Sequence, residues 1–283
     1  MRGGVDDLVT TLFPAECRVC DRPLVRASRV PVCEGCLEAA AKPQAGALCR
    51  VCGEALGWES EQALRQFGEG WGGDGRLCVP CRRIPPEFAR AVAPGVYEGE
   101  LRELIHLLKY ERMRGLAKPL GRMLAGAIEQ MEDEIDAAGA DWAVVAVPVF
   151  ATKAKERGYN HAEVLADVAT KELRERRPEW KLKAEHGALR RVRETASQFE
   201  LTPRARRENL RGAFAVTEGW DLVGRYVLLV DDIYTTGATA RTCAAVLRRA
   251  GAAGVLVATV ARAQVEAVAM WDGGRTGAER RLA

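Results

Sequence analysis

The stretch VLLVDDIYTTGATA, from Val227 to Ala240, decides how the rest of the chain is interpreted. An apolar run leads into two adjacent aspartates, and a turn rich in threonine follows. Such a run is typical of a strand that is buried on both faces of a sheet. The turn can direct several backbone N–H groups at one point, with the positive end of a helix dipole behind them. The stretch therefore predicts a buried strand that ends in a seat for an anion.

The flanking segments continue an alternation of strand and helix. Trp142–Phe150 and Gly254–Arg262 are apolar runs of strand length. Lys155–Glu175 has the pattern of a loop followed by an amphipathic helix, and Gly237–Ala252 that of a helix ended by Gly251. This order predicts an α/β fold, with a parallel sheet and helices on both of its faces. Ligands of such sheets bind at the carboxyl ends of the strands.

The chemistry of the opening stretch can be divided between its two halves. The turn Thr235–Thr239 offers hydroxyls and close backbone approach to a phosphate. Two carboxylates would repel that phosphate, so they suit a ribose diol or a hydrated magnesium ion. A capped helix with a solvated turn is the alternative, but it explains only one aspartate and one threonine. The predicted substrate-binding residues here are Asp231, Asp232, Thr235, Thr236, Gly237, Ala238 and Thr239.

Eight of the nine cysteines form four Cys-x-x-Cys pairs: Cys17/Cys20, Cys33/Cys36, Cys49/Cys52 and Cys78/Cys81. One pair would fit a redox motif equally well, but four pairs close together predict structural zinc, as one or two ions. Sequential pairing gives two sites of four thiolates with no open position for water. The sequence is also compatible with interleaved pairing of the four Cys-x-x-Cys motifs. The remaining cysteine, Cys243, is expected to be a buried core residue.

Composition limits the class of protein. The chain has 283 residues and a net charge of +3, too mild by itself to indicate a nucleic-acid binder. It shows no apolar run of membrane-spanning length and no secretory signal, so we expect a cytoplasmic protein without membrane insertion. Pro85-Pro86 suggests a linker. We expect a zinc module over residues 1–88, a domain built on the parallel sheet over 89–265 and a disordered tail over 266–283.

An amphipathic helix is expected around Leu101–Leu108, with a companion helix over Leu116–Ile135. His106 falls within its apolar stripe and is interpreted as a core histidine rather than a ligand. Lys109 follows the stripe, and two interpretations stay open for it: a solvated side chain, or one that points at an anion.

Val227–Thr239 resembles the 5-phosphoribosyl 1-diphosphate (PRPP) signature of type I phosphoribosyltransferases at every position. The wider chain resembles the ComF family of competence-associated proteins, in which a cysteine-rich zinc module precedes a phosphoribosyltransferase domain. Two further runs carry the likeness. They are Arg157-Gly158-Tyr159-Asn160, and the set Arg193, Thr195, Gln198, Leu201, Arg206, Asn209, Ala213 and Phe214. The chain departs from the family pattern at His161, where Gln is common, at Lys153, where Arg is frequent, and in its long insert Gly57–Gly75.

The resemblance implies roles for the basic segments. The loop Phe150–Tyr159 would hold the diphosphate of PRPP through Lys153, Lys155 and Arg157, together with Mg²⁺. Arg190–Arg211 would cover the site, with Arg193, Gln198 and Arg206 as contacts. A solvated basic face is the alternative for each arginine. The residues implied to take part in catalysis are Asp231, Asp232, Lys153, Arg157 and Arg193.

Two functions of different class follow. One is a PRPP-binding phosphoribosyltransferase whose acceptor the sequence does not identify. The other is an accessory protein of DNA uptake that binds single-stranded DNA, with competence-machinery proteins as possible partners. Residues 1–88 hold 11 Lys/Arg and 12 Asp/Glu, whereas residues 171–211 hold 13 Lys/Arg and 7 Glu. Any DNA contact is therefore expected in the 153–211 region and not on the zinc module.

Overall fold

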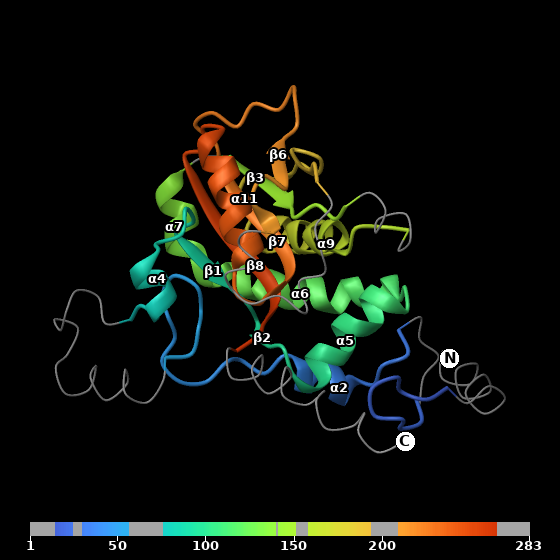
Figure 1. Cartoon of the computed structure of the whole chain (residues 1–283). Coiled ribbons are helices and arrows are strands. Elements are labelled where there is room, and N and C mark those ends of the chain that lie inside the picture. The colour runs from blue at the N-terminus through green and yellow to red at the C-terminus, as the bar shows by residue number, and fades with distance from the viewer. Residues whose placement is uncertain are drawn as a thin grey trace, which may run out of the picture.

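The computed structural model describes residues 15–24, 30–56, 76–139, 141–150, 158–193 and 209–264. Its centre is a sheet in which every pair of neighbouring strands is parallel, with the strand order β1-β8-β7-β3-β4 and with β2 also paired to β8 (Figure 1). The strands are β1 (Arg90–Val92), β2 (Gly95–Val96), β3 (Trp142–Ala146), β4 (Leu182–Ala184), β7 (Tyr226–Tyr234) and β8 (Gly254–Arg262). The predicted α/β fold class is confirmed.

Helices cover both faces of the sheet. On one face α5 (Gly99–Tyr110), α6 (Ala117–Ile128) and α9 (His161–Arg176) share a core with Leu228 and Val230 of β7. On the other face α11 (Ala238–Arg249) packs over Val227 and Leu229, as the period of two along a strand requires. The described residues also form the helices α2 (Glu34–Ala40), α4 (Val79–Arg83), η2 (Arg114–Leu116), η3 (Glu129–Met131) and α7 (Glu132–Ala138).

The three apolar runs of the sequence form the central strands β3, β7 and β8. The shorter strands β1, β2 and β4 lie in segments without such a run. β7 extends through both aspartates to Tyr234, whereas the sequence suggested that the strand ends at the acidic pair. A separate antiparallel pair, β5 (Leu189–Arg191) and β6 (Phe214–Val216), lies outside the central sheet.

The two cysteine segments pack into the same two cores as the sheet. Cys17 and Cys36 belong to the core on the α5 face, and α2 lies against α5. The four later cysteines, Cys49, Cys52, Cys78 and Cys81, belong to the core on the α11 face. In Figure 1, α2 and α4 accordingly lie at different places, beneath α5 and beside β1.

One side-chain prediction for α5 is wrong. His106 is exposed and lies with its ring centroid 4.6 Å from that of Tyr110 on the outer surface of the helix. Its neighbours Ile105 and Leu107 are buried, so a shift of one residue along the helix changes a side chain from buried to exposed. Cys243 is fully buried, as predicted.

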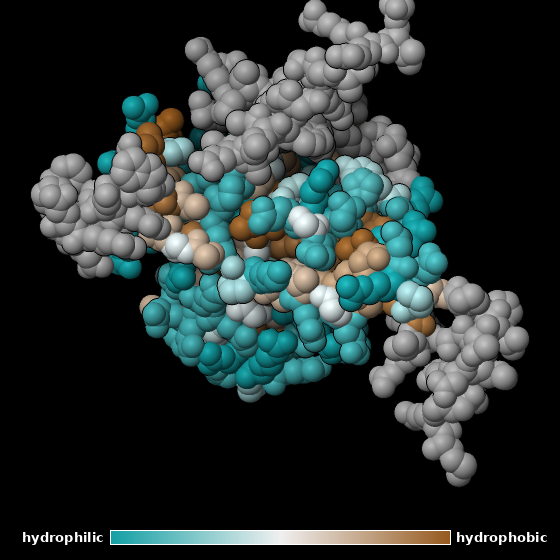
Figure 2. Space-filling model, turned by 90° about the horizontal axis from the view of Figure 1, so that it is seen from below, coloured by the Kyte–Doolittle hydropathy of each residue, from teal (hydrophilic) through white to brown (hydrophobic). Residues whose placement is uncertain are grey.

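Hydrophilic side chains dominate the described part of the face seen in Figure 2, and apolar ones lie mainly in a band across its middle. Among the helices of the described residues, none is long and apolar enough to cross a membrane. The insert Gly57–Gly75 and the tail 266–283 lie outside the described residues.

Candidate functional site

The carboxyl end of β7 brings two aspartates next to two basic side chains. Asp232 is buried, and its Oδ2 lies 2.8 Å from Nζ of Lys109 and 2.6 Å from Nε2 of His161. Asp231 is half-buried, and its Oδ1 accepts a hydrogen bond of 2.9 Å from the backbone N–H of Asp232. The acidic pair is therefore asymmetric, because only Asp232 has charged partners at contact distance in the described residues.

The two basic residues come from the ends of helices that the sheet brings together. Lys109 lies in the last turn of α5, and His161 is the first residue of α9. Asn160 caps α9 by accepting from the N–H of Ala162, and its side-chain amide donates to the carbonyl of Val147 just beyond β3. The hydroxyl of Tyr159 donates to the carbonyl of Leu108, which fixes the start of α9 against the end of α5.

The environment separates the pKa values of the two aspartates. Burial raises the pKa of Asp231 to about 8, and the neighbouring charge of Asp232 adds to the rise. Burial also opposes ionisation of Asp232, but Lys109 and His161 outweigh it and hold the pKa of that carboxyl well below its usual range. Burial lowers the pKa of Lys109, and Asp232 more than reverses this effect. Asp232 is thus a fixed carboxylate at neutral pH.

The turn after β7 has the geometry of an anion seat. Gly237 is the N-cap of α11 with φ +73°, in the left-handed region that favours glycine. The hydroxyl oxygen of Thr236 is buried and has no hydrogen-bond partner among the described residues. A buried hydroxyl without a partner is unfavourable unless a ligand or water completes it. Both features lie at the positive end of a 12-residue helix.

The loop residues predicted to contact substrate are only partly described. Lys153, Lys155, Arg157, Gln198 and Arg206 lie outside the described residues. Arg193 is described, and its Nη2 donates to the carbonyls of Asn209 and Arg211 at 2.7 and 3.0 Å. It therefore joins the two ends of the 194–208 segment. Its predicted role with substrate stays a prediction.

The cysteines form two tetrads that could hold metal ions, and the pairing is sequential, which removes the interleaved alternative. The first tetrad is Cys17, Cys20, Cys33 and Cys36, and the second is Cys49, Cys52, Cys78 and Cys81. Tetrahedral zinc with Zn–S bonds of about 2.3 Å requires sulfur separations of about 3.8 Å. Separations of 3.9 Å between Cys17 and Cys36, 3.7 Å between Cys20 and Cys33, and 3.5 Å between Cys52 and Cys78 fit this requirement.

Comparison with known proteins identifies relatives along most of the chain. DNA utilization protein YhgH of Salmonella typhi is 30% identical over 244 residues, which span 86% of this chain and 95% of that protein. The chain belongs to the ComF family. The Escherichia coli K12 protein of the same name is 32% identical over 180 residues, covering 64% of this chain and 75% of that protein. Competence protein F of Haemophilus influenzae Rd is 29% identical over 188 residues, covering 66% and 78%.

No family model matches this ComF-family sequence. Among solved structures, TT1426 from Thermus thermophilus is 20% identical and covers 56% of this chain and 79% of that chain, with a TM-score of 0.31.

Two site residues of this ComF-family chain are not assigned by the sequence. For Lys109 the sequence leaves two interpretations open, and its position beside Asp232 supports the one in which it points at an anion. His161 stands out in the sequence only as a departure from the family pattern, yet it contacts the same carboxylate. The available signal is weak, because each is one polar residue at a helix end. Only the packing of the two helices shows that α5 ends, and α9 begins, beside the carboxyl end of β7.

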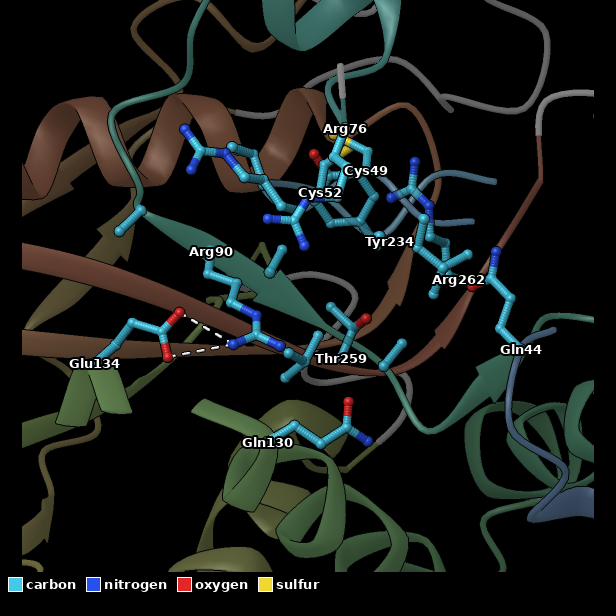
Figure 3. Close-up of a pocket in the computed structure, with 18 residues that line it drawn as sticks. Gln44, Cys49, Cys52, Arg76, Arg90, Gln130, Glu134, Tyr234, Thr259 and Arg262 are labelled. Atoms are coloured by element: carbon cyan, nitrogen blue, oxygen red, sulfur yellow. Dashed lines mark hydrogen bonds and ion pairs between the residues drawn. The ribbon is translucent and has the colours of Figure 1, made fainter. Parts of the chain in front are cut away.

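A cavity of about 530 Å³ lies between the second tetrad and the edge strand β1 of the ComF-family fold (Figure 3). Tyr234 and Thr259 contribute to its wall, and Arg90 forms an ion pair with Glu134 inside it. Arg262, which is 3% exposed, also lines it. The cavity thus borders the residue that immediately precedes the Thr235–Thr239 turn.

Proposed function

We propose that this protein binds PRPP, or a closely related ribose 5-phosphate ester, at the carboxyl end of β7. The observation that carries the proposal is the buried hydroxyl of Thr236, which has no partner among the described residues, just before the N-cap of α11 and four residues after Asp232. A phosphate in the turn would accept hydrogen bonds from that hydroxyl and from the backbone N–H groups. The ribose hydroxyls of the same molecule would then face the carboxylates.

The two aspartates suit different parts of this ligand. Asp232 is neutralised by Lys109 and His161, so it is poorly suited to a cation but can still accept hydrogen bonds from a ribose diol. Asp231 has no cation at contact distance in the described residues and provides the oxygen ligand that Mg²⁺ prefers. Magnesium, when bound, would neutralise the diphosphate of PRPP. Lys153, Lys155 and Arg157 would reinforce that neutralisation from the loop after β3.

The reaction that fits this arrangement is displacement of diphosphate from C1 of the ribose by a nucleophile. Positive charge develops on the sugar as the C1–O bond breaks, and negative charge develops on the leaving diphosphate. The contribution of the protein would be positioning and electrostatic stabilisation. The Arg190–Arg211 segment, with Arg193, Gln198 and Arg206 as its contacts, would exclude water while this occurs.

The cellular role that we infer is DNA uptake or use, because the relatives are named for DNA utilization and competence. We further infer zinc in each tetrad, where four thiolates leave no position for a reactive water, so that each ion would be structural. The division into a cysteine module over 1–88 and a phosphoribosyltransferase-like domain over 89–265, with a disordered tail over 266–283, is part of this proposal, as is a location in the cytoplasm.

Isothermal calorimetry with PRPP and Mg²⁺ tests the proposal. Wild type should bind, and Asp232→Asn should bind at least about tenfold more weakly because a charge-assisted hydrogen bond to the ribose is lost. Asp167→Asn, an exposed substitution on α9, is the control and should bind like wild type. Failure of the wild type to bind PRPP under these conditions would refute the proposed function.

Single-stranded DNA is a second candidate ligand, favoured by the basic balance of residues 171–211 and by the placement of Arg190 and Arg191 on β5. Binding would track phosphates and weaken steeply as salt rises. Replacing Arg190, Arg191 and Arg193 by glutamine should lower the affinity and flatten the salt dependence in a fluorescence anisotropy titration. Unchanged binding after the triple replacement would remove this candidate.

A further inference from the structure

The Thr235–Thr239 turn lies close to the second tetrad. Tyr234, which precedes the turn, is 4% exposed, and the guanidinium carbon of Arg262 lies 4.4 Å from the centre of its ring. Arg262 forms an ion pair with Glu54, two residues after Cys52. Figure 3 shows Tyr234 beside Cys49 and Cys52, with Arg262 next to it. One path of contacts therefore runs from the second tetrad through Arg262 and Tyr234 to the N-terminal end of the turn.

A second path reaches the other end of the turn. Arg241 lies in the first turn of α11, and its backbone N–H donates to the carbonyl of Gly237. Nη2 of Arg241 lies 3.3 Å from Sγ of Cys81, and Nη1 donates to the carbonyl of Ile84. The N-terminus of α11 is thus attached directly to a cysteine of the second tetrad.

The turn itself rests on the tyrosine. A Cβ placed on Gly237 would lie 2.1 Å from the hydroxyl oxygen of Tyr234 and 2.3 Å from Cζ, so no side chain separates the turn from the ring. A displacement of this ring therefore displaces the turn. The first tetrad has a different neighbourhood: Arg18 near Cys17 pairs with Glu111 after α5, and no contact with the turn is found among the described residues.

We propose that the metal ion of the second tetrad positions the Thr235–Thr239 turn, with Arg241, Arg262 and Tyr234 as the positioning residues. A zinc ion with four thiolates carries two net negative charges, which guanidinium N–H donors stabilise from outside the ligand shell. The four ligands come from two chain segments, Cys49–Cys52 and Cys78–Cys81. The ion would therefore hold in place both Cys81, which Arg241 contacts, and Glu54, which Arg262 contacts. Loss of the second ion should loosen the anion seat, and loss of the first should not.

Amide hydrogen exchange tests the positioning without any ligand. In the full-length, zinc-loaded protein, Arg241→Gln should raise exchange of a peptide spanning Thr235–Thr239 at least about fivefold. Arg18→Gln, which removes the ion pair beside the first tetrad, is the matched control and should leave that peptide unchanged. Arg241→Lys should restore part of the protection, and peptides from β8 and α9 should exchange as in wild type. Equal exchange of the turn peptide in Arg241→Gln and wild type would overturn the proposal.

Cadmium NMR gives a direct readout of the tetrads. Cadmium replaces zinc at thiolate sites, and each tetrad should give its own signal, assigned with a Cys20→Ser sample that changes only the signal of the first tetrad. Arg241→Gln should shift the second signal and not the first, because a hydrogen bond to Cys81 is lost. A shift of the first signal only would contradict the assigned path.

The consequence for substrate rests on the proposed function. Arg241→Gln should weaken PRPP affinity about tenfold by calorimetry, whereas Arg18→Gln should not alter it. If the wild type fails to bind PRPP while the exchange and cadmium results hold, the proposed function is refuted and the positioning stands. If PRPP binds and Arg241→Gln leaves both its affinity and the exchange unchanged, the positioning is refuted alone.

Discussion

Adjacent aspartates in β7 have opposite electrostatic surroundings. Asp232 is stabilised as a carboxylate by Lys109 and His161, and its charge disfavours a second charge on Asp231. Ionisation of the Asp231 carboxyl group in the folded protein is therefore unfavourable. The pair therefore combines one permanent anion with one carboxyl whose ionisation depends on its partner.

Asp231→Asn should stabilise the protein in a pH-dependent manner. The pKa of Asp231 is about 8 in the fold and 3.8 as its ordinary value, so the folded state binds more protons than the unfolded state between these limits. The wild type therefore loses stability as pH rises through this window, and the amide does not. Thermal unfolding should show a higher Tm for Asp231→Asn at pH about 8, and no gain near pH 4. The exposed substitution Asp133→Asn is the control, and a gain independent of pH would contradict the assignment.

Gly237→Ala should destabilise the protein and disturb the proposed anion seat. The residue has φ +73°, and the added methyl would meet the buried ring of Tyr234. We expect a loss of about 1–3 kcal/mol in the free energy of unfolding, measured with urea. Gly139→Ala also has positive φ but open space around it, so it should lose about 1 kcal/mol, from backbone strain alone. Equal losses for the two variants would show that the ring is not in the way.

Among the elements, β4 and β7 are joined, away from the site, by an ion pair between the buried Glu185 and the half-buried Arg225. Glu185, just after β4, is 4% exposed and accepts two hydrogen bonds from Arg225, at 2.7 and 2.9 Å. Those bonds and Lys183 hold the pKa of Glu185 below its usual range, despite burial. This pair fixes the position of β4, the edge strand beyond β3.

Arg225→Met should destabilise the fold by about 3 kcal/mol at neutral pH, because it leaves a buried carboxylate with Lys183 alone. Arg122→Met is the matched control, because it breaks an ion pair with Glu172 in which the Arg122 side chain is 52% exposed. This substitution should lower the free energy of unfolding by less than about 1 kcal/mol. The stability that Glu185 contributes is present above its ordinary pKa of 4.5 and is lost as pH falls through the lowered one. The difference between wild type and Arg225→Met in urea titrations should therefore shrink in acid.

The elements also show how far the sequence predicts this structure. Continuous apolar runs identify β3, β7 and β8, because these strands are buried on both faces. The short edge strand β1 has no such run, since its pairing depends on β8, which is distant in sequence. Local sequence likewise predicts the threonine turn, because its residues are consecutive. It does not predict that Lys109 and His161 contact Asp232, because those contacts depend on how α5 and α9 pack together.

Across the whole molecule, the two tetrads differ in their access to solvent. Cys20 is exposed and Cys33 half-buried in the first tetrad, whereas all four cysteines of the second are buried. The difference follows from packing, because the second tetrad is enclosed between β1, α11 and the end of β8.

A chelator should therefore remove the two proposed zinc ions in two phases. Access of the chelator to the first ion needs no opening of the core, whereas release of the second needs local unfolding. Spectrophotometric titration with a zinc-binding dye should give a fast and a slow phase of equal amplitude. Cys20→Ser should abolish the fast phase only. A single phase for both ions would contradict the inferred difference in access.

The pairing of β1 with β8 has a consequence for synthesis on the ribosome. Ala91 accompanies Val257 in the sheet, and its N–H also donates to Val51 in the second cysteine segment. The four cysteines of the second tetrad could bind the proposed ion as soon as Cys81 has emerged. They cannot reach their final neighbours until residues 254–262 have been translated. The second cysteine segment is thus made before the strand that completes its surroundings, and it is among the last parts of this fold to be fully assembled.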